Sequence, residues 1–180
     1  YSLLAHNAFG IDARCFRFLE YADIEDAQMV AKMLRGISTP PLIIGGGSNL
    51  LLTGDYDSYV VHSAIKGHEV LPADDADHLL LRVGSGEVWD DVVALCVKNG
   101  WQGAENISLM PGEVGASAVQ NIGAYGVEVK DTVWKVEGYV ISTGQPFSLS
   151  NAECRFGYRN SIFKQTLKNA GCTKRVYLGE

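Results

Sequence analysis

The hydrophobic pattern of the first 66 residues predicts strands around one helix. Residues 13–21 and the apolar runs 41–44 and 59–62 are typical of strands. Asp23 is a good N-cap for a helix over 24–35, and Gly36 ends it. The apolar residues of that helix share one face, and they are Ile24, Ala27, Val30, Ala31 and Leu34. We therefore place a first lobe at residues 1–66.

A second lobe, residues 67–180, shows a different order of elements. A strand at 78–83 is broken by Gly84-Ser85-Gly86, and an amphipathic helix follows over 87–99. We expect the inward face of this helix to hold Trp89, Val92, Val93, Cys96 and Val97. A strand at 132–141 and its return at 147–149 flank a hairpin turn. Strands and helices do not alternate regularly, which predicts an α+β fold of two lobes.

Composition excludes several classes of protein. A net charge of −6 and scattered basic residues argue against nucleic-acid binding, which needs a basic face. No apolar run approaches the roughly 20 residues of a membrane span, and the first residues do not resemble a signal peptide. We expect a cytoplasmic protein.

The metal-binding residue types are dispersed along the chain, so we expect no metal site. No cysteine pair has C-x-x-C spacing, which favours free, buried thiols at Cys15, Cys96, Cys154 and Cys172. The histidines are equally scattered, at His6, His62, His68 and His78.

Two glycine-rich stretches suggest that a ligand approaches the backbone. The first, Gly45-Gly46-Gly47-Ser48-Asn49, follows an apolar strand and can turn backbone N–H groups toward an anion. It is neither a Walker loop nor a dinucleotide fingerprint, and a plain tight turn is the alternative.

The second stretch, residues 111–126, combines small residues with two amides, Gln120 and Asn121. Amides donate and accept hydrogen bonds, as the heteroatom edge of a flavin requires. Tyr125 lies between Ala124 and Gly126, so we expect its ring to be exposed in a cleft. A small-residue helix packed against a neighbour is the alternative, although Pro111 and the glycines fit a helix poorly.

A third cluster interleaves basic and aromatic residues over 154–164. Arginine binds carboxylate or phosphate through two parallel hydrogen bonds, so this cluster can clamp an anionic substrate. The alternative is a surface salt-bridge stretch with inward aromatics.

Together these stretches resemble the UDP-N-acetylenolpyruvoylglucosamine reductase family. The similar segments are Gly45-Gly46-Gly47-Ser48-Asn49-Leu50-Leu51, Gln120-Asn121-Ile122-Gly123-Ala124-Tyr125-Gly126 and Cys154-Arg155-Phe156-Gly157-Tyr158-Arg159-Asn160-Ser161-Ile162-Phe163-Lys164. Asn7-Ala8-Phe9-Gly10-Ile11 and Glu105-Asn106 are also similar, in the same order along the chain.

The resemblance implies a two-lobed FAD-binding module of the vanillyl-alcohol-oxidase type. It implies non-covalent FAD, NADPH as reductant and hydride transfer to the enolpyruvyl ether of a UDP-sugar in peptidoglycan precursor synthesis. The residues that it places at the cofactor are Gly45, Gly46, Gly47, Ser48, Asn49, Gly112, Gly115, Ala116, Gln120, Asn121 and Gly123. It places Tyr125 and Arg159 at the substrate, with Arg159 stabilising the charge that develops during hydride transfer.

Three departures qualify this expectation. Ala118 stands where the family usually has proline, and Ala8 stands where it usually has threonine. We also expect that a C-terminal domain, which in the family supplies a proton-donating serine and much of the substrate pocket, lies outside this chain. The chain alone is then expected to lack turnover. Alternatives are a non-catalytic FAD-binding module or another flavin oxidoreductase of the same fold class.

Overall fold

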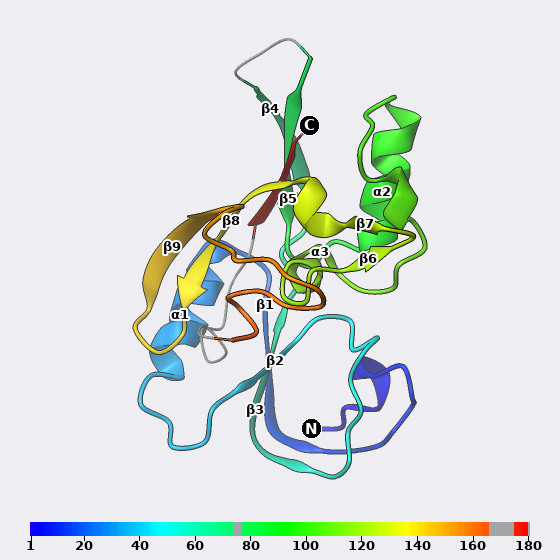
Figure 1. The fold of residues 1–180 in the computed structure, drawn as a ribbon. Helices are drawn as coiled ribbons and strands as arrows, with labels where there is room; N and C mark the ends of the chain where they lie inside the picture. The colour runs from blue at the N-terminus through cyan, green and yellow to red at the C-terminus, as the bar shows by residue number, and fades with distance from the viewer. Residues whose placement is uncertain (74–76, 166–174, 180) are drawn as a thin grey trace.

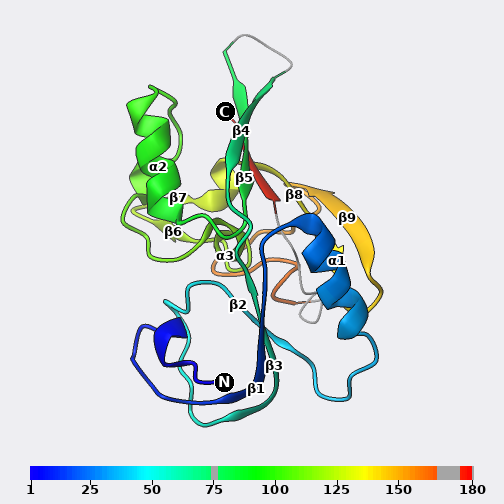
Figure 2. The ribbon, with the colours of Figure 1, turned by 180° about the vertical axis from the view of Figure 1, so that it is seen from behind.

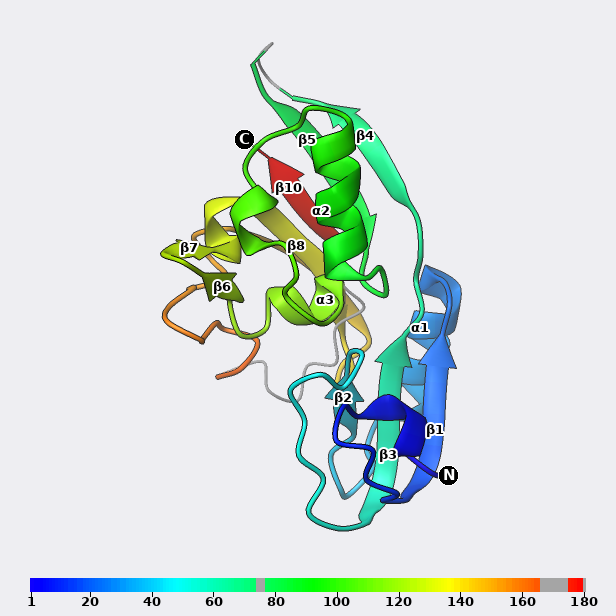
Figure 3. The ribbon, with the colours of Figure 1, turned by 90° about the vertical axis from the view of Figure 1, so that its right-hand side faces the viewer.

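The computed structural model describes residues 1–73, 77–165 and 175–179. Two main sheets lie at opposite ends of the molecule, and the segments that connect them meet between the sheets (Figures 1 and 3). The predicted α+β class is confirmed.

The first sheet is parallel and has the order β1-β3-β2. Its strands are β1 (Cys15–Tyr21), β3 (Tyr56–Ser63) and β2 (Leu42–Ile44). Helix α1 (Ile24–Met33) connects β1 to β2, and the Asp23 carboxylate caps it by accepting a 2.8 Å hydrogen bond from the amide of Asp26. The predicted cap is therefore confirmed, and the helix ends two residues earlier than predicted.

The second sheet is antiparallel and has the order β4-β5-β10-β8-β9. Its strands are β4 (His68–Pro72), β5 (Leu79–Gly84), β10 (Arg175–Gly179), β8 (Val133–Val140) and β9 (Gln145–Ser150). The hydrophobic pattern did not predict β4. Strand β10 joins the β4–β5 hairpin to the β8–β9 hairpin, as Figure 1 shows.

Helix α2 (Trp89–Lys98) packs against the second sheet through four buried residues, Trp89, Val92, Val93 and Cys96 (Figure 3). The prediction that Val97 faces inward is wrong, because its side chain is 59% exposed. Val97 follows the buried Cys96, and one residue turns the helix by about 100°.

Short elements precede β1 or lie between β5 and β8 of the second sheet. They are η1 (Leu4–His6), η2 (Glu105–Ile107), α3 (Val114–Ser117), β6 (Gly123–Ala124), β7 (Val127–Glu128) and η3 (Val129–Asp131). The stretch at 111–126 thus holds one helical turn and the first strand of a hairpin, so neither an open loop nor a long small-residue helix describes all of it.

The two sheets are joined by packing as well as by the chain. Helix α1 contacts both β1 and β8 (Figure 2). Gln28 Nε2 on this helix donates a 2.8 Å hydrogen bond to the hydroxyl of Tyr139 on β8. Ile141, just after β8, belongs to the same buried cluster as Tyr21 and Ala27. The division at residue 66 stays a prediction.

Cys15, Cys96 and Cys154 are free and buried, as predicted, and Cys172 lies outside the described residues. Burial raises the pKa of the Cys96 thiol, with a smaller contribution from Glu105.

We expect Trp89→Phe to lower the free energy of unfolding by about 1–3 kcal/mol. The Trp89 side chain is fully buried and its Nε1 donates a 2.9 Å hydrogen bond to the buried carbonyl of Ile107, which the variant leaves unsatisfied. Urea denaturation measures the change. Trp134→Phe is the matched control, because Trp134 is 49% exposed and its loss should change stability by no more than about 0.5 kcal/mol. Equal effects of the two variants would contradict this role for Trp89.

Candidate cofactor site

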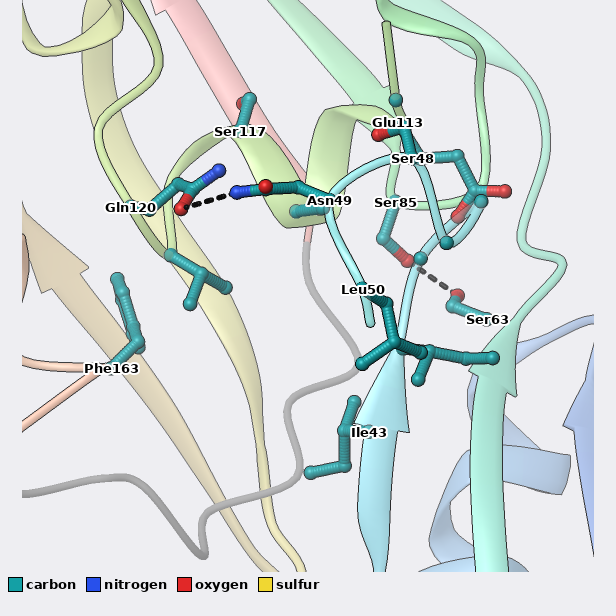
Figure 4. A pocket seen from close by; sticks show the side chains of 18 of the residues that line it. Ile43, Ser48, Asn49, Leu50, Ser63, Ser85, Glu113, Ser117, Gln120 and Phe163 are labelled. Carbon is teal, nitrogen blue, oxygen red and sulfur yellow. Dashed lines mark hydrogen bonds between the residues drawn. The ribbon is translucent and has the colours of Figure 1, made fainter. Parts of the chain in front are cut away.

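A cleft of about 730 Å³ lies between the two glycine-rich stretches. One wall is formed by residues 40–50, which include the end of β2, and the other by residues 111–120, which include α3. Ser63, Ser85 and Trp89 also line the cleft. Figure 4 shows Phe163 on one side and Ile43 and Leu50 on the other, with Asn49 and Gln120 above them in the view.

The cleft collects most, though not all, of the residues predicted at the cofactor. Those that line it are Gly45, Gly46, Gly47, Ser48, Asn49, Gly112, Gly115, Ala116 and Gln120. Asn121, Gly123, Tyr125 and Arg159 are not among its lining residues.

The three glycines of the first wall differ in how much space a side chain would have at each position. Gly47 has φ +67°, and a Cβ there would lie 2.0 Å from the carbonyl oxygen of His6, so the fold itself requires glycine. A Cβ on Gly45 would lie 3.0 Å from Cβ of Ala116, on the opposite wall. A Cβ on Gly46 would approach Glu113 no closer than 3.7 Å. Gly46 is therefore the glycine of this turn that internal packing explains least.

The small residues of the second wall mainly allow segments of this chain to pack closely. A Cβ on Gly115 would lie 2.7 Å from Cβ of Ser85, and a Cβ on Gly123 would lie 2.4 Å from the carbonyl oxygen of Val127. Gly112 differs, because it has φ +126° and would meet only the Ser48 hydroxyl, at 3.3 Å. Ligand approach is thus not needed to explain Gly115 or Gly123.

Polar side chains link the walls across the cleft. Asn49 Nδ2 donates a 3.2 Å hydrogen bond to Gln120 Oε1, and the two side chains point toward one another in Figure 4. The Ser48 hydroxyl donates to the carbonyl of Pro111 at 3.3 Å. The buried Ser63 and Ser85 hydroxyls share a 2.5 Å hydrogen bond (Figure 4). Hydrogen bonds of Ser48 and Asn49 therefore link the two stretches on which the cofactor prediction rested.

Asn121 is buried and hydrogen-bonded to other segments of the chain. Its side chain is fully buried, its Nδ2 donates to the Gly157 carbonyl at 3.0 Å, and its Oδ1 accepts from the Lys130 amide at 3.1 Å. Its backbone has φ +48°, which asparagine tolerates better than most residues. Asn121 thus connects the segment around Gly157 to η3.

The two residues predicted at the substrate lie close to the β6–β7 hairpin. Tyr125 is 99% exposed at the turn, with φ +53°. The Arg159 Nη2 donates a 2.7 Å hydrogen bond to the carbonyl of Gly123. The pKa of the Glu128 carboxyl is lowered, first by its hydrogen bond to Lys130 and in smaller part by the charge of Arg159. A shared neighbour, Gly123, therefore brings Tyr125 and Arg159 to one region outside the cleft.

The basic and aromatic cluster at 154–164 does not gather around one point. Arg155 and Tyr158 are exposed, and Tyr158 is 85% accessible. Phe163 is buried and lines the cleft together with Lys164, whose Nζ donates a 3.0 Å hydrogen bond to the Arg159 carbonyl. The inward-aromatic alternative thus fits Phe163 but not Tyr158.

A charged group that the sequence did not reveal lies beside the glycine turn. His62 on β3 contacts Glu113 through Nε2, at 3.0 and 3.2 Å, and Glu20 on β1 through Nδ1, at 2.8 Å. The pKa of His62 is raised, chiefly by the hydrogen bond to Glu113. His62 and Glu113 are 51 positions apart in the sequence, and no local pattern indicates this contact, which depends on the packing of the two walls.

The chemistry of the cleft fits a flavin dinucleotide. Leu42, Ile43, Leu50, Val119 and Phe163 offer apolar surface for a ring system. The Ser48 hydroxyl and the amides of Asn49 and Gln120 offer hydrogen bonds, and Gly46 leaves its backbone uncovered by a side chain. Large apolar clefts with few placed polar groups are typical of cofactor sites, and this volume falls in the usual range of roughly 300–1,000 Å³.

Comparison with known proteins decides the family. The family described as "FAD binding domain" matches residues 17–149, which include both walls of the cleft. The chain belongs to this FAD-binding domain family. FAD is accordingly the cofactor of this domain.

Curated relatives confirm the resemblance found in the sequence. The chain is 53% identical over 165 residues to a UDP-N-acetylenolpyruvoylglucosamine reductase of Bacteroides fragilis, covering 92% of this chain and 49% of that protein. It is 42% identical over 169 residues to the reductase of Flavobacterium johnsoniae, covering 94% of this chain and 49% of that one. The chain of this FAD-binding domain protein therefore spans about half the length of these relatives.

A solved structure supports the fold. The crystal structure of UDP-N-acetylenolpyruvylglucosamine reductase from Thermus caldophilus superposes with a TM-score of 0.75 at 22% identity, covering 99% of this chain and 60% of that one. At this identity the likeness shows the fold alone.

The described residues of this FAD-binding domain also bear on membrane and metal sites. None of its helices there combines the length and apolar character that a membrane crossing requires. No group of three or more His, Cys, Asp or Glu side chains is placed there to hold a metal ion.

We expect Gly47→Ala to lower the free energy of unfolding by at least about 2 kcal/mol, because the new Cβ would overlap the His6 carbonyl in a left-handed conformation. Gly46→Ala is the matched control one residue away. Its Cβ makes only ordinary contacts, so stability should change by no more than about 0.5 kcal/mol. Chemical denaturation of both variants compares them, and a Gly47→Ala protein of wild-type stability would show that this approach to His6 is not required.

Proposed function

We propose that this chain is the flavin-binding part of an NADPH-dependent reductase of UDP-N-acetylglucosamine enolpyruvate, acting in cytoplasmic peptidoglycan precursor synthesis. The product would be UDP-N-acetylmuramate. The observation that carries the proposal is the cleft itself, which lies within the FAD-binding domain match and is built from the two stretches that resemble the reductase family. The similarity to reductases of this name supports the reaction.

Within this proposal the two walls bind different parts of FAD. Gly45, Gly46 and Gly47 with Ser48 and Asn49 would hold the diphosphate, since they place backbone and small polar groups together at the end of β2. Gly112, Gly115, Ala116 and Gln120 of the second wall would line the flavin, and the Gln120 amide could hydrogen-bond to its polar edge. When bound, FAD would supply the hydride chemistry between NADPH and the enolpyruvyl substrate. The chain's own residues bind and orient the cofactor.

Tyr125 and Arg159 would act on the substrate rather than on FAD. Both lie outside the cleft near the β6–β7 hairpin, where a second ligand can reach them. The Arg159 guanidinium uses one nitrogen for the Gly123 carbonyl, which orients it and leaves other donors available. It would pair with the substrate carboxylate and stabilise the negative charge that develops beside it.

A second candidate is a module that binds FAD without turnover. The family match favours considering it, because the matched description, over residues 17–149, is FAD binding. The two candidates predict the same cofactor and differ in catalysis.

The test begins with the encoding gene, read on both sides of these 180 residues, and uses its complete product. We expect a yellow protein whose flavin spectrum is bleached by NADPH and restored by the UDP-sugar enolpyruvyl ether. Flavin binding without reoxidation by that substrate would favour the binding module. Failure to bind FAD would overturn both candidates. The 180-residue chain alone is expected to bind FAD weakly and to show no turnover, because part of the contact surface is then missing.

In the complete product we expect Arg159→Ala to lower kcat/KM by about 3 kcal/mol of transition-state stabilisation, the magnitude of a lost oxyanion donor. Arg155→Ala is the matched control, because Arg155 is also an arginine with positive φ but is exposed. Steady-state kinetics with the flavin content held equal measures both. A wild-type rate for Arg159→Ala would refute the assigned role.

A further inference from the structure

Both ring nitrogens of His62 contact carboxylates. Nδ1 lies 2.8 Å from Oε2 of Glu20, and Nε2 lies 3.0 Å and 3.2 Å from the two carboxylate oxygens of Glu113. An ionised carboxylate can only accept hydrogen bonds, so both nitrogens must donate. The contacts therefore select the imidazolium form of His62.

The groups around His62 come from three elements. Glu20 on β1 is half exposed, whereas Glu113, just before α3, is 14% exposed, as is His62 itself. The His6 ring, on η1, lies 6.5 Å from the His62 ring between centroids, and the Phe18 ring of β1 lies 6.1 Å away. Burial, and then the charge of His62, lower the pKa of His6. His62 is thus a cation that two carboxylates share.

Glu113 lies directly against the glycine turn. Its Oε2 is 3.3 Å from the position of a Cβ on Gly45, and its Oε1 is 3.7 Å from that on Gly46. Glu113 also lines the cleft, and Figure 4 shows it beside Ser48. An unpaired carboxylate at this place would repel an anion bound by the same turn. Pairing with the His62 imidazolium would weaken that repulsion.

The pair also connects the two walls. His62 lies beside Ile44 in the register of β2 and β3, and Ile44 precedes Gly45. Glu113 forms a bridge with Val88 at the start of α2, in the other half of the molecule. The position of Glu113 relative to the turn is therefore set by His62 from one wall and by α2 from the other.

We propose that His62 is a positioning residue of the anion subsite: its imidazolium holds Glu113 and neutralises it, so that a diphosphate can bind the glycine turn. The inference rests on the proposed function, because it takes FAD as the ligand whose diphosphate lies there.

Binding of FAD is linked to protonation of His62, so FAD affinity should change with pH in a defined direction. Because the pKa of His62 is raised by folding, its stabilisation is complete below the ordinary value near 6.5 and is lost as pH rises through the folded value. A bound diphosphate favours the imidazolium further. FAD affinity should then be constant at low pH, fall by up to about tenfold per pH unit above the pKa of His62, and be accompanied by proton uptake.

The experiment uses the complete gene product and two flavins. FAD and riboflavin are titrated by fluorescence across the pH range in which His62 titrates, and riboflavin is the probe without a diphosphate. The variants are His62→Gln, Glu113→Gln and their combination. His68→Gln, an exposed histidine on β4, is the matched control. NMR follows the His62 ring in the protein without flavin.

We expect FAD, but not riboflavin, to lose affinity as pH rises in the wild type and in His68→Gln. His62→Gln should bind FAD about tenfold more weakly at low pH, the equivalent of one pKa unit of coupling, and without pH dependence. Adding Glu113→Gln should restore that affinity, since the repelling charge is gone. A merely structural contact would show no such rescue.

Three results would overturn the inference while leaving the proposed function intact. They are an unchanged FAD pH profile in His62→Gln, failure of Glu113→Gln to rescue it, and a His62 that titrates below its ordinary pKa. Equal pH dependence for riboflavin and FAD would overturn it as well. If wild-type protein binds neither flavin at any pH, the proposed function fails and the inference fails with it.

Discussion

The close approach of three backbone segments at the junction between the sheets determines the rest of the structure. Residues 63–65, at the end of β3 and just after it, contact Gly84 and Gly86 so closely that a Cβ on either would lie within 2.5 Å of a carbonyl oxygen. Gly115 packs equally closely on Ser85, and its amide donates to the Ser85 carbonyl at 2.8 Å. Side chains at these glycines would force the two sheets apart. The cleft exists at its present width because this junction holds its walls.

The hydrophobic pattern predicted the regular elements because their burial is periodic. α1, α2, β1, β2 and β8 all lie close to their predicted ranges. β4 escaped prediction because its residues are largely exposed, and Val97 was misplaced because apolar character alone does not fix the edge of a helix face. The short elements of 114–128 depend on contacts with distant residues, which no local pattern contains.

Both glycine-rich stretches line the cleft, but most of their glycines are explained by packing within the chain. Gly47, Gly115 and Gly123 are needed for contacts within the chain, so the original argument that a ligand requires bare backbone applies most directly to Gly46. The His62–Glu113 pair could not be predicted at all, since neither residue lies in a recognisable motif. Of the residues that the resemblance assigned to the cofactor, all but Asn121 and Gly123 line the cleft. Tyr125 and Arg159 lie instead near the β6–β7 hairpin, which no local pattern predicted.

The position of β10 has a consequence for how this molecule is made. Residues 175–179 form the middle strand of the second sheet, between hairpins that precede them by at least 25 residues of chain. Neither the β4–β5 edge nor the β8 edge is paired until that strand arrives. During synthesis the edges of β5 and β8 therefore stay unpaired until β10 has been made, and unpaired strand edges are prone to mispairing. Folding of the second sheet must be a late, non-local event, and slow production or early termination before residue 175 should favour aggregation over a partly folded monomer.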